Sequence, residues 1–152
     1  MLQTRSFVKF WLPVIAWTLI IFSVSGDKLS NQHSSRIMGP ILHWLFPKMP
    51  EKTVDEIVFL VRKWAHGTEY AVLAILLWRA RSKPLKPGFR SWRWPEARLV
   101  WLLSVLYAAT DELHQAFVPN RQSSVVDVLI DSVGAALGLV LIWGFGRWRR
   151  YW

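Results

Sequence analysis

Ionisable side chains interrupt the apolar segments of this sequence at three places. His66 and Glu69 lie in one segment and Asp111 in the next, and all three can exchange protons as general acids or bases. Other polar residues nearby are candidates for binding a substrate: Lys63, Tyr70, Glu112, Gln115, Arg121, Ser124, Asp127 and Asp131. An ionisable group inside a membrane span costs about 2.5–3.5 kcal/mol, so such groups are expected to face inward and pair with one another.

Helical spacing places these groups on shared faces. Lys63, His66 and Tyr70 are three and seven positions apart, which puts them on one face with Glu69 beside them. The last apolar segment carries a second stripe, made of Asp127, Asp131, Gly134 and Gly138. Its G-x-x-x-G motif permits close helix packing, so the two aspartates are expected to point into a helix bundle.

The first pair allows three interpretations. His66 with Glu69 could be a structural pair, an acid/base pair or part of a metal site. No compact metal signature such as H-E-x-x-H is present, so no metal is predicted. His114 and Glu112 are interpreted as facing the lipid headgroups.

The start of the last apolar segment has its own chemistry. Ser124 can cap a helix, with Asp127 three residues later completing a capping box. Arg121 beside this helix start could bind a phosphate or could simply fix the loop. Asp127 and Asp131 could pair with Lys63 or with a neighbouring arginine, or could handle a proton or a substrate.

Four dense apolar segments must hold these residues. Hydrophobic residues make up 53% of the chain and charged residues 19%, and each segment approaches the roughly 20 residues that a bilayer requires. The expected fold is an all-α, four-helix transmembrane bundle, a single domain over residues 1–152, with spans at about 10–24, 57–78, 97–117 and 125–145. A short segment at 37–46, broken by Gly39-Pro40, is expected to lie in the interface with Trp44 at headgroup depth. The first segment could alternatively be a signal peptide.

The distribution of Lys and Arg predicts the topology. These residues concentrate in the second loop and the C-terminal tail, which places both termini in the cytoplasm and the protein in the cytoplasmic (inner) membrane. The net charge of +9 is therefore interpreted as a topology signal and not as nucleic-acid binding. The absence of cysteine excludes disulfides and thiol catalysis.

Three motifs together resemble the VanZ-like family. They are residues 62–70 (RKWAHGTEY), 111–121 (DELHQAFVPNR) and 127–138 (DVLIDSVGAALG). The resemblance implies a small multi-pass membrane protein, and the family is linked to teicoplanin resistance. Two residues depart from the pattern: Asn120 stands where a glycine is usual, and Gly67 where a bulky residue is usual.

Three classes of function remain open at this stage. The first is a membrane protein that binds a phosphate-bearing lipid or an envelope precursor at the outer face, with membrane lipids as partners and no cofactor. The second is a membrane enzyme acting on a lipid-linked phosphate, with His66, Glu69 or Asp111 as acid or base. The third is a structural or assembly protein, in which the polar residues only lock the bundle.

Overall fold

The computed structural model describes residues 2–25, 30–82, 92–118 and 123–152. These residues form α-helices and no strand, which confirms the all-α prediction. The helices of the described part are α1 (Leu2–Ser25), α2 (Ser30–Leu45), α3 (Glu51–Arg81), α4 (Trp94–Ala116) and α5 (Val125–Trp148).

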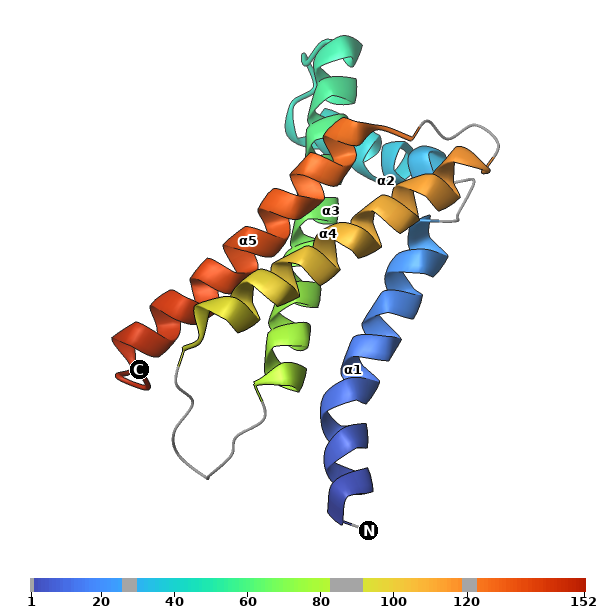
Figure 1. The fold of residues 1–152 in the computed structure, drawn as a ribbon. Helices are drawn as coiled ribbons and strands as arrows, with labels where there is room; N and C mark the ends of the chain where they lie inside the picture. The colour runs from blue at the N-terminus through green and yellow to red at the C-terminus, as the bar shows by residue number, and fades with distance from the viewer. Residues whose placement is uncertain (1, 26–29, 83–91, 119–122) are drawn as a thin grey trace.

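The four long helices run side by side, and α2 lies across one end of them (Figure 1). Both termini lie at the opposite end, because the four long helices alternate in direction (Figure 1). Helix α3 is central: it packs most extensively against α5 and also contacts α1, α2 and α4.

Local sequence explains where the helices begin. The hydroxyl of Ser124 accepts a hydrogen bond of 3.2 Å from the Val126 amide, which caps α5 as predicted. Pro95 occupies the first turn of α4, where its missing N–H is not needed. Pro50 is extended and directly precedes α3. Both α3 and α5 end in arginines, which suit the negative end of the helix dipole.

Close packing between α3 and α5 depends on small residues at two levels. A Cβ at Gly134 would overlap the carbonyl oxygen of Gly67, and one at Gly138 would overlap that of Ala71. Gly67 thus contributes backbone atoms to the contact surface, whereas a Cβ on Gly67 itself would make only an ordinary contact of 3.7 Å with Ile130 Cγ2. The predicted glycine stripe therefore does face the bundle, and it brings the two helix backbones together.

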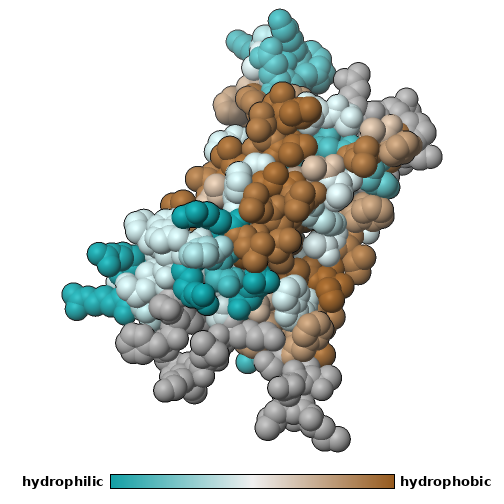
Figure 2. Space-filling view, viewed as in Figure 1, coloured by the Kyte–Doolittle hydropathy of each residue, from teal (hydrophilic) through white to brown (hydrophobic). Residues whose placement is uncertain are grey.

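Two of the described helices, α1 (Phe7–Ser25) and α5, are long and apolar enough to cross a membrane. Helices α3 and α4 carry more charged residues. With 31 residues, α3 is about 46 Å long at 1.5 Å per residue, more than a hydrocarbon core needs. Its first turns are exposed and charged (Glu51, Lys52, Asp55 and Glu56). Figure 2 shows hydrophilic side chains at that end and hydrophobic ones over the middle of the same face.

The predicted break at Gly39-Pro40 is wrong. Helix α2 runs without interruption from Ser30 to Leu45, through Pro40. A proline disfavours the helical conformation of the preceding residue partly through a clash with its Cβ, and Gly39 has none. The helix also includes residues 30–36, which precede the segment at 37–46 that was expected to lie in the interface.

Candidate functional site

Polar residues from four helices gather at the end of the bundle near α2. They come from the end of α1, the middle of α3, the last turns of α4 and the first turns of α5 (Figure 1). We call this set the polar layer; it comprises Ser25, Lys63, His66, Glu69, Tyr70, Asp111, Glu112, Gln115, Ser124, Asp127 and Asp131. The expected convergence of polar groups from three helices is thus present, and α1 adds a fourth.

Asp111 is the centre of a buried hydrogen-bond network between α1 and α4. The Ser25 hydroxyl donates to Asp111 Oδ2 at 2.8 Å. Gln115 Nε2 donates to Ser25 Oγ at 2.6 Å and to Asp111 Oδ2 at 3.2 Å. All three side chains are buried, so this network is a structural clamp as much as a candidate site. Ser25 was not among the predicted site residues, because a single serine after an apolar segment has no spacing pattern.

Lys63 of α3 forms an ion pair with Asp127 of α5. Their side chains are 23% and 21% exposed, so the pair lies at the edge of the layer and not at its centre. The pair agrees with the interhelical ion pair that was one interpretation of Asp127. The reciprocal half of the predicted capping box is not formed, because the Ser124 amide that would donate to Asp127 donates to Glu112 instead.

Glu112 fills the anion position that was predicted at the start of α5. Its Oε2 accepts a hydrogen bond of 2.9 Å from the backbone amide of Ser124. Only 7% of Glu112 is exposed, so the interpretation that it faces the headgroups is wrong. A carboxylate beside a helix N-terminus is favoured by the free N–H groups and by the helix dipole. Arg121, the other part of the predicted anion site, lies outside the described residues.

His66 lies within electrostatic range of several carboxylates. Its Nδ1 is 3.5 Å from Oε2 of Glu69, an ion-pair distance longer than a good hydrogen bond. It also interacts electrostatically with Asp111, Glu112 and Asp131 from the other helices. The backbone carbonyl of Glu69 accepts a 2.9 Å hydrogen bond from the Trp17 indole, which fixes this part of α3 to α1.

Some polar atoms of the layer are buried without a hydrogen-bond partner in the described part of the chain. They are the Tyr70 hydroxyl, Oδ1 of Asp111 and Oδ1 of Asp131. Tyr70 is fully buried and Asp131 is 3% exposed. Both were predicted to contact a ligand, and both are more deeply buried than Lys63 and Asp127.

The polar layer contains more acidic than basic side chains. Its carboxylates outnumber its cationic groups, and Lys63 is already engaged by Asp127. Within the described ranges, no three His, Asp or Glu side chains are placed to hold a metal ion. His114, which also lies at this end of α4, stacks on Phe22 with ring centroids 4.3 Å apart.

Comparison with known proteins gives one family match. A model of the VanZ/LLP1 family matches residues 10–146, which includes every residue of the polar layer. No curated protein and no solved structure matches the chain.

Proposed function

Because the chain belongs to the VanZ/LLP1 family, we propose that it acts at the outer face of the cytoplasmic membrane, where its polar layer binds the phosphate-bearing headgroup of a lipid or an envelope precursor. Family membership and two apolar helices indicate a membrane protein. Our proposal adds the number of membrane spans, their orientation and the ligand.

Four membrane spans are supported because charged side chains of α3 and α4 lie inside the helix bundle. Asp111 and Glu112 are buried and hydrogen-bonded, and Lys63 is ion-paired with α5. Paired in this way, the groups are turned away from lipid, which lowers their insertion penalty. The shared end of the two termini and the arginines at the ends of α3 and α5 support cytoplasmic termini.

One observation carries the ligand proposal: two hydrogen-bond donors at the rim of the layer already hold carboxylates. The Lys63 ammonium holds Asp127, and the Ser124 amide holds Glu112. An ammonium and a helix N-terminal N–H are groups that bind phosphate oxygens. In the proposed mechanism a headgroup phosphate replaces one or both carboxylates on these donors, and the side chains of Asp127 and Glu112 turn aside.

This exchange predicts a gain of affinity when the competing carboxylate is neutralised. We expect Glu112→Gln to bind a short polyprenyl phosphate about tenfold more tightly, because a hydrogen bond to a charged group contributes about 1.5 kcal/mol. Lys63→Met should weaken binding by a similar factor. Glu56→Gln, on the exposed first turns of α3, is the matched control and should change nothing.

The measurement is retention of the lipid by the purified full-length protein in native mass spectrometry, with the uncharged polyprenol as reference ligand. Equal retention of phosphate and alcohol would refute phosphate recognition. Unchanged retention in Glu112→Gln, with helix content preserved, would refute the exchange. Teicoplanin susceptibility of cells that express each variant is a parallel test of the role linked to the family.

His66 supports a second candidate, an enzyme acting on a lipid-linked phosphate. An imidazole beside a carboxylate, as in His66 and Glu69, is an arrangement used for general acid/base catalysis. Release of inorganic phosphate from a polyprenyl diphosphate, lost in a folded His66→Gln variant, would favour the enzyme. Binding of the lipid without release of phosphate would favour a binding protein. Absence of both binding and release would favour a structural role.

A further inference from the structure

A hollow of about 630 Å³ lies beneath the turn that joins α2 to α3. Leu45, Phe46, Met49 and Thr53 form most of its apolar wall, and Lys48 also lines it. Backbone hydrogen bonds fix the turn: the Phe46 amide donates to the Leu42 carbonyl at 2.8 Å, and the Met49 amide to the Phe46 carbonyl at 3.0 Å. The volume falls within the range of roughly 300–1,000 Å³ that is usual for small-molecule sites.

The apolar wall is open and not covered by another part of the described chain. Phe46 is 55% exposed and Leu45 is 53% exposed. The exposed side of α2 continues the same surface through Ile37, Ile41 and Trp44, which are four and seven positions apart. An exposed apolar stripe that ends in an open hollow is unusual for a surface in water and typical of a helix at a membrane interface.

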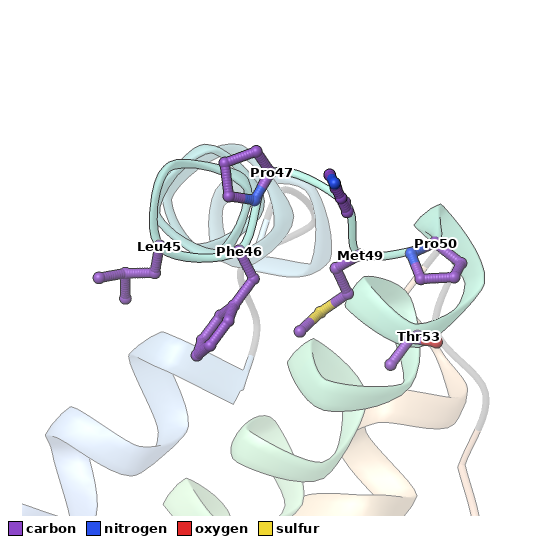
Figure 3. A pocket seen from close by; sticks show the side chains of 7 residues that line it. Leu45, Phe46, Pro47, Met49, Pro50 and Thr53 are labelled. Carbon is purple, nitrogen blue, oxygen red and sulfur yellow. The ribbon is translucent and has the colours of Figure 1, made fainter.

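The position of the hollow indicates from which side it is filled. Figure 3 shows Phe46 and Met49 projecting from the turn on the side where α1 and α3 run. Helix α1 is one of the two helices apolar enough to cross a membrane. A hydrocarbon chain lying along these helices would therefore reach the hollow directly from the bilayer.

Lys48 gives the site a charge preference. It lines the hollow, and within the part of the chain that the structure describes it has no ion-pair partner. A lysine above an apolar hollow matches a phospholipid, whose phosphate lies next to its acyl chains.

We propose that the hollow binds one anionic phospholipid of the surrounding leaflet, with an acyl chain against Phe46 and Met49 and the phosphate at Lys48. This site is separate from the polar layer and needs neither Glu112 nor Lys63. It would hold the α2–α3 turn at a fixed depth in the membrane surface.

Depth can be tested by site-directed spin labelling, because the chain contains no cysteine. Full-length Phe46→Cys and Asp55→Cys are labelled with a nitroxide and reconstituted in vesicles of phosphatidylcholine and phosphatidylglycerol. We expect oxygen to reach the label at 46 more readily than a water-soluble nickel complex, and the reverse at 55. A label at 46 that the nickel complex reaches, or that neither reagent reaches, would overturn the proposal in favour of water or a protein partner.

Headgroup preference is tested on the protein with its native Phe46. The fraction of motionally restricted spin-labelled phosphatidylglycerol is compared with that of phosphatidylcholine. We expect Lys48→Gln to reduce the preference for phosphatidylglycerol about fivefold, the effect of one lysine at a membrane surface. Lys52→Gln, exposed on the first turn of α3 outside the hollow, is the control and should leave it unchanged. Equal loss in both variants, or no preference in the unmodified protein, would overturn the phosphate contact.

Discussion

Replacing Gly134 by alanine should separate α5 from α3. A Cβ at this position would overlap the Gly67 carbonyl and lie 2.8 Å from Gly67 Cα. Carbon atoms in favourable contact are about 3.5–4.0 Å apart, so the helices must move apart by about 1 Å. The obstacle is backbone, which cannot turn away as a flexible side chain could.

The magnitude follows from two opposing effects. Overpacking a tight contact costs about 1–3 kcal/mol, and a backbone obstacle places Gly134→Ala near 3 kcal/mol. Alanine is favoured over glycine in a helix by about 1 kcal/mol, which offsets part of this cost. The net loss in free energy of unfolding should therefore be about 2 kcal/mol.

Gly67→Ala is the matched control from the same interface. A Cβ there would lie 3.7 Å from Ile130 Cγ2, an ordinary van der Waals contact. This variant should keep the unmodified stability or gain up to about 1 kcal/mol from helix propensity. Unfolding by sodium dodecyl sulfate in mixed micelles, followed by far-UV circular dichroism, measures both variants. If Gly134→Ala and Gly67→Ala unfold within about 0.5 kcal/mol of each other, the packing argument is refuted.

Two further predictions concern contacts between helices. The Lys63–Asp127 ion pair joins α3 to α5 and is about one-quarter exposed, so removing either partner should cost about 1–3 kcal/mol. In a double-mutant cycle with Lys63→Met and Asp127→Asn, the second substitution should cost less than it does alone; additive losses would contradict a direct interaction. Tyr107→Phe removes a 2.7 Å hydrogen bond to the Thr18 carbonyl between α4 and α1, and should lower the free energy of unfolding by about 1 kcal/mol. Unchanged unfolding of Tyr107→Phe would show that this hydrogen bond contributes no stability.

The features that sequence predicted well are those encoded by side-chain type and spacing. Three members of the predicted stripe, Asp131, Gly134 and Gly138, are buried as helical periodicity required, whereas the Asp127 side chain is 21% exposed. The meeting of polar residues from three segments followed from the alternating direction of successive helices. Neither inference needed knowledge of the contacts themselves.

Two kinds of contact could not be predicted from the sequence. One kind involves backbone atoms, and the other involves residues that belong to no spacing pattern. Glu112 binds the backbone amide of Ser124, and the Trp17 indole binds the backbone carbonyl of Glu69. Every residue has these backbone groups, so no residue type identifies the partner. Ser25 and Asp111 are 86 positions apart, and nothing in either segment specifies the other.

Helix lengths were underestimated for a related reason. The predicted spans followed apolarity, whereas helices follow hydrogen bonding and continue into polar surroundings. Helix α3 begins at Glu51, six positions before the predicted span at about 57, and its added turns are charged and exposed. The same difference explains why α2 begins at Ser30.

The internal pairing of the polar layer links its stability to the proposed binding. The rim donors Lys63 and the Ser124 amide are satisfied by Asp127 and Glu112, so neither donor is unpaired. A ligand phosphate must then replace an existing interaction, and its net affinity is the difference between the two. A substitution that removes an internal carboxylate should therefore weaken the fold and strengthen binding together, the opposite of what a purely structural layer would do. Asp127 and Glu112 are thus the residues at which a bundle-locking role and a binding role make opposite predictions.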